Sequence, residues 1–173
     1  MNMSPTVSAM LEERYPIDIC NGLLRNVTPY GIFELIRDIK DPEHPYTLEQ
    51  LGVISKEDIH IETFECDGIT PDVGLPILCV CVEFKPTIPH CSMAAIIGLC
   101  IKTHLDRFIR NHAISVKIAD GAHVNYKALN KQLNDKDRVM AALENEVLID
   151  LMKECLPDVL NLSNGESHVK VTK

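Results

Sequence analysis

The sequence predicts a small two-layer α/β domain, of the α+β type, in which a three-stranded mixed sheet packs against helices. Apolar residues make up 46% of the 173-residue chain, which is enough for a core without disulfide staples. Two neighbouring segments have the alternating or continuous apolar pattern of strands, and a third such segment follows after a helical pattern. A strand, a helix and a strand in succession imply a right-handed crossover with parallel pairing.

The first helix is expected to begin at Pro29, because Thr28 is a good N-cap and proline suits the first helical position. Asp41 and the proline after it should stop this helix, since a residue before proline avoids helical backbone. Strands over residues 59–63 and 77–84 should form an antiparallel hairpin. The remaining elements are expected to be a helix over residues 91–110, a strand over 114–119, and helices over 135–144 and 146–155.

The chain length fits one domain with tails at both ends. Residues 1–27 are expected to be a flexible N-terminal tail, because they lack a sustained period. Residues 28–160 should form the domain, and the polar residues 161–173 a flexible C-terminal tail.

The charge balance narrows the classes of partner. The net charge is −8, whereas contacts with nucleic-acid phosphates need clustered lysine and arginine. An anionic membrane surface is disfavoured for the same reason. The first residues show no signal peptide, and the longest apolar stretch, Ala94–Ile101, is far too short to span a bilayer. The protein is therefore expected in the cytoplasm.

Seven cysteines without a secretory signal or a C-x-x-C motif argue against a disulfide framework. Cys79 and Cys81 share one face of a strand, so they are either two soft metal ligands or, as we favour, buried beneath a helix. Cys100 and His104 have the spacing of a metal pair on a helix. A core cysteine beside a surface histidine is the simpler interpretation.

Cys91 is the strongest candidate for chemistry. It follows the stiff stretch from Pro86 to Pro89 and falls at or just before the first turn of a helix. Free backbone N–H groups at that turn, with His90 alongside, favour a thiolate and predict an exposed cysteine of depressed pKa. The alternative is a half-buried loop cysteine beside a solvated histidine. Nothing in the sequence places a carboxylate next to Cys91, as a protease triad would require.

Two polar segments are candidate partner-binding sites, although a simple helix stop and a solvated helix start are the default interpretations. Residues 41–45 form a rigid turn with two prolines, and residues 130–138 precede an apolar helix. The candidate partner-binding residues are Asp41, Glu43, His44, Asn130, Lys131, Asp135, Lys136 and Arg138.

Several motifs together resemble a known family. They are Phe33–Pro45, Thr47–Leu51, Pro86–Ala94, Ile97–Lys102, Asn130–Arg138 and Ala141–Asn145. The sequence resembles the Cia-two type targeting subunit of cytosolic iron–sulfur protein assembly, which is related to bacterial SufT and PaaD-like proteins. The resemblance spans residues 29 to about 160.

The resemblance implies an adaptor and not an enzyme. The implied partners are a WD40-propeller subunit, a HEAT-repeat subunit and iron–sulfur client apoproteins in the cytoplasm and nucleus, with a homodimer as a further assembly. The functional cysteine of the family corresponds to Cys91, which is also the candidate metal ligand, with Pro89, His90 and Ser92 in support. No tightly bound cofactor is expected, only a transient iron–sulfur cluster. A small thiol enzyme using Cys91 and a structural zinc protein using Cys79 and Cys81 remain as alternatives.

Overall fold

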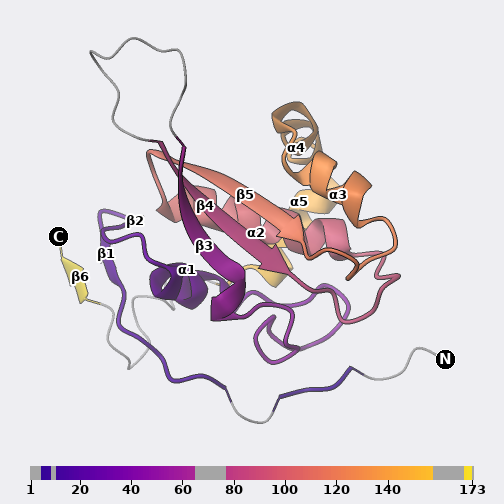
Figure 1. Ribbon diagram of the computed structural model, residues 1–173, viewed down its shortest axis with the longest axis horizontal. Helices are drawn as coiled ribbons and strands as arrows, with labels where there is room; N and C mark the ends of the chain where they lie inside the picture. Colours follow the sequence, from indigo (N-terminus) through magenta and orange to yellow (C-terminus); the bar gives the residue numbers. More distant parts are fainter. Residues whose placement is uncertain (1–4, 9–10, 65–76, 158–169, 173) are drawn as a thin grey trace.

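The computed structural model describes residues 5–8, 11–64, 77–157 and 170–172. In chain order the elements are β1 (Asp18–Cys20), β2 (Leu23–Leu24), α1 (Pro29–Ile36), the 3-10 turn η1 (Lys56–Asp58), β3 (Ile59–Phe64), β4 (Ile77–Phe84), α2 (Ala94–Phe108), β5 (His112–Ile118), α3 (Tyr126–Leu133), α4 (Lys136–Ala142), α5 (Glu146–Cys155) and β6 (Lys170–Thr172). Figure 1 follows them through the molecule. Within the described ranges, no helix has the length and apolar character needed to cross a membrane.

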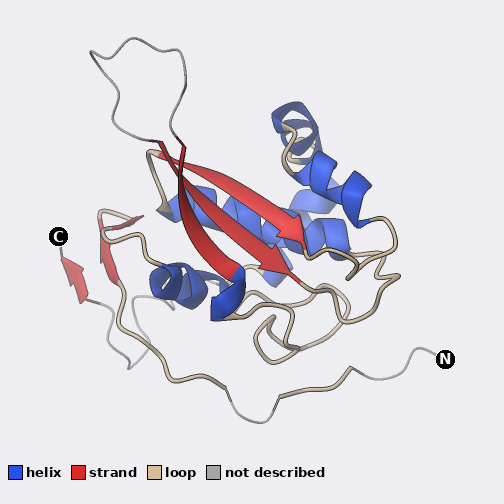
Figure 2. Ribbon diagram, viewed as in Figure 1, coloured by secondary structure: helices blue, strands red, loops and turns tan. Residues whose placement is uncertain are grey.

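The main sheet has the strand order β3-β4-β5, with β3 antiparallel and β5 parallel to β4. In Figure 2 the helix α2 lies behind this sheet, α1 lies beside the lower end of β3, and α3 and α4 lie beyond β5. The parallel pair follows from the crossover through α2, as expected for a strand, helix and strand in succession. The predicted α+β domain with a three-stranded mixed sheet is confirmed.

The two faces of the central strand β4 have different surroundings. Val80, Val82 and Phe84 are fully buried and belong to the core that the helices cover. Cys79 and Cys81 alternate with them and therefore point to the other face of the sheet. Both cysteines are buried, and their sulfur atoms lie 3.8 Å apart. Burial is confirmed, but the expectation that a helix covers them is wrong, because the core cluster lies on the opposite face.

Side chains of the N-terminal segment are buried in the core from residue 17 onward. Strands β1 and β2 form a hairpin whose turn uses positive φ angles at Asn21 and Gly22, as a tight two-residue turn requires. Three side chains of this segment are buried in the core: Ile17, Ile19 and Leu24. The predicted tail boundary at residue 27 therefore lies inside the packed structure. The apolar residues of this segment occur in short pairs without a helical or strand period, so their burial could not be predicted from the sequence pattern.

The predicted C-terminal tail, residues 161–173, lies mostly outside the described residues. The part that is described forms β6, which pairs with β1 in parallel.

Several helix ends differ from the prediction. α2 begins at Ala94 and not at Cys91, and α4 begins at Lys136 with Asp135 as its N-cap. The helix α3 was not predicted, because its one buried residue, Leu133, leaves little apolar periodicity to detect. Gly98 lets α3 approach α2 closely, since a Cβ there would lie 2.6 Å from the Leu133 side chain.

Side chains of α2 and α3 occupy the outer backbone edge of β5. Asn130 accepts a hydrogen bond from Ile118 N at 2.7 Å and donates one to Ile118 O at 3.0 Å, as a neighbouring strand would. Asn134 and Lys102 donate to two further carbonyl oxygens of the same strand. The amide and ammonium groups thus satisfy an edge that otherwise lacks a strand.

A fully buried arginine joins α1 to the N-terminal segment. The Arg37 guanidinium bonds to Glu49 through Nε at 2.8 Å and Nη2 at 2.6 Å, and to Glu34 through Nη1 at 2.6 Å. It also donates to the Glu12 carbonyl at 2.6 Å. Both carboxylates are buried, and each is paired with the Arg37 guanidinium inside the protein.

Candidate functional site

Cys91 lies in the connection between β4 and α2, held by backbone hydrogen bonds. Its N–H donates to Ile88 O at 3.2 Å, and its carbonyl accepts from Ala94 N at 3.4 Å. Val124 N donates to Pro89 O at 3.0 Å, which attaches this connection to the loop after β5. The two prolines and these bonds fix the position of the cysteine before the helix begins.

The turn at residues 41–45 is built around a buried carboxylate. Asp41 Oδ1 accepts hydrogen bonds from Glu43 N at 2.8 Å and His44 N at 3.0 Å, and it lies 3.0 Å from His44 Nδ1. Asp41 and His44, predicted as partner-binding residues, thus shape the turn itself. The turn directs the side chain of Glu43 out of the loop.

The two segments meet. Glu43 Oε2 lies 4.0 Å from Cys91 Sγ, and Ser92 Oγ donates a hydrogen bond to Glu43 Oε1 at 3.3 Å. The sequence analysis found no carboxylate beside Cys91, and the structure corrects this. The two residues are 48 positions apart, and no local pattern links them.

The expected exposure and acidity of Cys91 are wrong. Its exposed fraction is 4%. Burial raises the pKa of the Cys91 thiol, and the Glu43 and Asp41 carboxylates raise it further. Backbone N–H groups of Met93 and Ala94 lower the pKa, as a helix start should, but burial is the larger effect. The thiol is therefore protonated at neutral pH in the isolated chain.

A buried histidine that no sequence motif indicated, His123, forms a hydrogen bond with the backbone of Cys91. His123 Nδ1 accepts a hydrogen bond from Asn125 N at 3.0 Å, so Nε2 carries the proton and donates to Cys91 O at 3.2 Å. Both ring nitrogens are thus engaged with backbone. His123 follows β5 in a loop without a motif, so no sequence signal pointed to it.

A cavity of about 310 Å³ opens at Cys91. His90, Ser92, His123 and Val124 border it together with the cysteine. His90 is exposed, as the alternative interpretation held. Cys91 is thus a buried residue in the wall of this cavity.

The second predicted segment contributes differently. Asn130 binds β5, and Asp135 caps α4 by accepting from Asp137 N and Arg138 N. Lys131, Lys136 and Arg138 are exposed. The partner-binding role of these residues stays a prediction.

Among the described residues, no three His, Cys, Asp or Glu side chains come together as a metal site requires. The predicted surface histidine beside Cys100 is wrong, since His104 is buried in the core. Cys100 instead belongs to the buried core together with Cys155 of α5. At the candidate site, Cys91 and Glu43 supply two donor groups.

Comparison with known proteins agrees with the resemblance seen in the motifs. No family model matches the chain. Protein AE7-like 1 of Arabidopsis thaliana is 40% identical over 165 residues, covering 90% of this chain and 94% of the relative. A MIP18 family protein of Caenorhabditis elegans is 46% identical over 75% of this chain and 76% of its own length. The cytosolic iron-sulfur assembly component 2B of Mus musculus is 48% identical over 72% of this chain and 70% of the relative. The chain therefore belongs to the MIP18 family, which includes the cytosolic iron-sulfur assembly component 2B proteins.

Proposed function

We propose that this chain is an adaptor subunit of a cytosolic iron–sulfur targeting complex, and that it helps deliver clusters to cytosolic and nuclear apoproteins through Cys91. The names of its relatives support the pathway. The observation that carries the role of Cys91 is its contact with Glu43 at a cavity, because two sequence motifs far apart in the chain meet there.

The donor groups suit a transient cargo. An iron–sulfur cluster is held by about four ligands, mostly cysteine thiolates. This chain offers one thiol and one carboxylate at the site, so the remaining ligands of a cluster must come from another protein. A cluster shared in this way is handed over when the other protein supplies its full set of ligands. No tightly bound cofactor is then needed in this chain.

An adaptor fits the site better than a thiol enzyme. A nucleophilic cysteine needs a lowered pKa or a base within reach. Burial raises the pKa of Cys91, the nearby Glu43 carboxylate raises it further and so disfavours the thiolate, and both nitrogens of His123 are engaged with backbone groups. The alternative of a structural zinc protein lacks support, because no third ligand lies near Cys79 and Cys81 in the part of the chain that the structure describes.

The proposed partners are a WD40-propeller subunit, a HEAT-repeat subunit and client apoproteins, with a second copy of the chain as a further assembly. The exposed Lys131, Lys136 and Arg138 are candidate contacts. The net charge of −8 is the reason to expect neither nucleic acid nor an anionic membrane as a direct partner.

Replacing Cys91 by alanine tests the proposal. In cells that lack the native protein, Cys91→Ala should reduce iron incorporation into a cytosolic client to the level of cells without the protein. Recovery of the propeller subunit should be unchanged, because an interface depends on many contacts. The loss of folding stability should be on the order of 1 kcal/mol, since only one small side chain is truncated.

Cys20→Ala is the matched control, because Cys20 is a half-exposed thiol in the hairpin far from the site. Normal client iron with Cys91→Ala would contradict the role of this cysteine. Loss of both iron and partner would make it an interface residue.

A further inference from the structure

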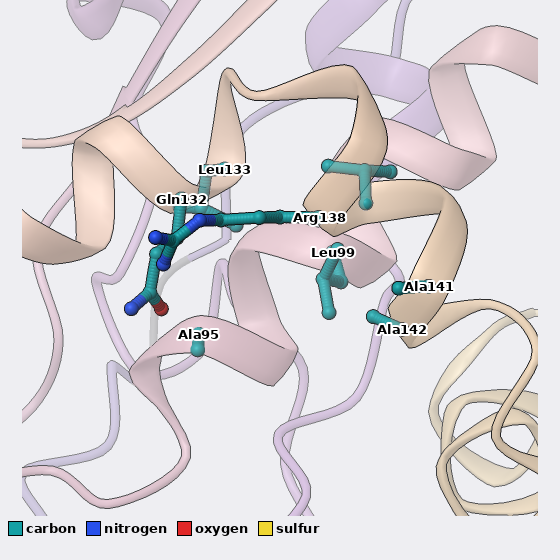
Figure 3. Close-up of a pocket in the computed structure, with 8 residues that line it drawn as sticks. Ala95, Leu99, Gln132, Leu133, Arg138, Ala141 and Ala142 are labelled. Carbon is teal, nitrogen blue, oxygen red and sulfur yellow. The ribbon is translucent and has the colours of Figure 1, made fainter.

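A second cavity of about 300 Å³ lies between α2, α3 and α4, and Figure 3 shows its lining. Its interior is apolar, formed by Leu99, Leu133, Val139 and Ala142. Gln132 and Arg138 lie at its mouth, where the Arg138 side chain extends toward Gln132. An apolar side chain would fit this hollow, with polar groups available beside it.

This hollow adjoins the cavity at Cys91. Ala95 lines both of them, and Leu99 follows one helical turn later. On the opposite wall, Leu129 borders the Cys91 cavity and Leu133 borders the second one. The two cavities thus form one groove between α2 and α3, with the thiol at one end. We name it the α2–α3 groove.

The groove lies beside a basic segment of an acidic protein. The segment Tyr126–Ala142 carries four basic and two acidic side chains, whereas the whole chain has a net charge of −8. Arg138 faces Asp135 through Nε at 3.6 Å, and both side chains are substantially exposed. Because such an exposed pair is weak, the guanidinium can accept another carboxylate on its Nη groups.

We propose that the α2–α3 groove binds an extended segment of an iron–sulfur apoprotein, with an apolar side chain in the hollow, a carboxylate on Arg138 and a cysteine at Cys91. This inference rests on the proposed function and gives it a recognition surface. The five helical steps from Ala94 to Leu99 rise roughly 7.5 Å, and the turn from Cys91 to Ala94 adds less than about 7 Å, whereas an extended chain covers about 3.3 Å per residue. The client cysteine and its apolar residue are therefore three to four positions apart.

Disulfide exchange with designed peptides tests this spacing. Each nine-residue peptide carries one cysteine activated as a thionitrobenzoate disulfide, and a leucine next to a glutamate. In the two test peptides the leucine–glutamate pair lies four positions before or four positions after the cysteine. In the control peptide the pair lies directly beside the cysteine. The Cys91 thiolate attacks the peptide sulfur and releases thionitrobenzoate, whose absorbance reports all reacting thiols, so the Cys91 rate is taken from the peptide-modified fraction of Cys91 over time. Peptide mapping by mass spectrometry identifies Cys91 as the modified residue.

One of the two spaced peptides should modify Cys91 about tenfold faster than the control, the effect expected from one buried leucine. Arg138→Glu should remove most of this advantage, and a peptide with lysine in place of glutamate should restore it. Ala141→Leu, at an exposed position that lines the hollow, should also reduce it.

Lys153→Glu on α5 and Ala128→Leu on α3 are the matched controls, since both residues are exposed and neither lines the groove. Both should keep the advantage, and unconjugated dithionitrobenzoate should react equally with all variants. Equal rates for all spacings, or an unchanged advantage in Ala141→Leu, would overturn the groove. Such a result leaves the Cys91→Ala maturation test unaffected, so the two proposals fail separately.

Discussion

Two clusters of polar side chains lie beneath the surface of this protein, and they are built on opposite principles. Around Arg37, two buried carboxylates meet a guanidinium whose nitrogen donors are engaged by Glu34, Glu49 and the Glu12 carbonyl. Around Cys91, the Asp41 and Glu43 carboxylates lie near a thiol and raise its pKa. The first cluster pairs its carboxylates with a cation, whereas the second places negative charge around a thiol that would itself become negative on ionising.

The difference separates structural from functional burial. A buried ion pair is stable once complete, and removing one member leaves an uncompensated charge. A thiol held protonated beside carboxylates gains no stability from them at neutral pH. Such an arrangement is typical of sites where chemistry and not folding decides the residues.

The largest effect on stability is expected from breaking the buried ion pairs around Arg37. Arg37→Met should lower the free energy of unfolding by about 3–5 kcal/mol, because Glu34 and Glu49 would stay buried without a cation. Urea denaturation measures it. Arg14→Met is the control, since the Arg14 pair with Asp38 is largely exposed and should matter by less than about 1 kcal/mol. Equal losses of unfolding free energy in the two variants would show that the buried Arg37 pairs contribute no more than the exposed Arg14 pair.

A second test uses His104, a buried group that is not paired with a carboxylate among the described residues. Burial, with the nearby Arg107 cation, lowers the pKa of His104 to about 4. The unfolded chain, with a histidine pKa near 6.5, therefore takes up the proton first as the pH falls. Stability should be full above about pH 6.5 and fall between there and pH 4, with about 2 kcal/mol lost at pH 5.

Urea midpoints at pH 7, 6 and 5 would show this decline. His104→Leu should lose the histidine part of it, while the carboxylates titrate alike in both proteins. A parallel decline in the variant would show that His104 contributes nothing to it.

The smallest effect concerns the second cluster. Burial raises the pKa of Cys91, and Glu43 adds to it, so Glu43→Gln should lower that pKa and increase the thiolate fraction at pH 8. Alkylation of Cys91 by iodoacetamide should accelerate a few-fold, and the rise of the rate with pH should begin at lower pH. Peptide mapping with mass spectrometry gives the rate of each cysteine.

In the parent protein Cys20, which is half-exposed, should react faster than Cys91. Glu57→Gln, an exposed carboxylate in η1, is the control and should leave the Cys91 rate unchanged. A slower reaction in Glu43→Gln would contradict the electrostatic role of Glu43.

Local signals predicted the fold better than the site. The start of α1 at Pro29 needed only its cap and its proline, and the strands β3 and β4 followed from their apolar patterns. Helix α3 escaped detection, because its attachment depends on Asn130 bonds to β5 and on the absent side chain of Gly98. Such contacts depend on the tertiary structure and leave no period in the sequence.

At the site, the cysteine could be identified from its motif, but its surroundings could not. The burial of Cys91, its contact with Glu43 and the support of His123 join three separate stretches of chain. The local effect of the helix start was predicted with the right sign, yet burial outweighs it. Single-sequence reasoning estimates the local contribution to a pKa and cannot estimate the desolvation that the whole fold imposes.

The amide side chains that occupy the outer edge of β5 also bear on how the protein behaves at high concentration. An unpaired strand edge is a template on which another chain can add a strand, the first step of aggregation into fibres. The Asn130 side chain forms hydrogen bonds with the outer edge of β5, so that edge is not free. Among the described strands, none pairs with the outer side of β3. Within the described part of the main sheet, strand addition to the folded protein is therefore open on the β3 side, whereas Asn130, Asn134 and Lys102 protect the β5 side.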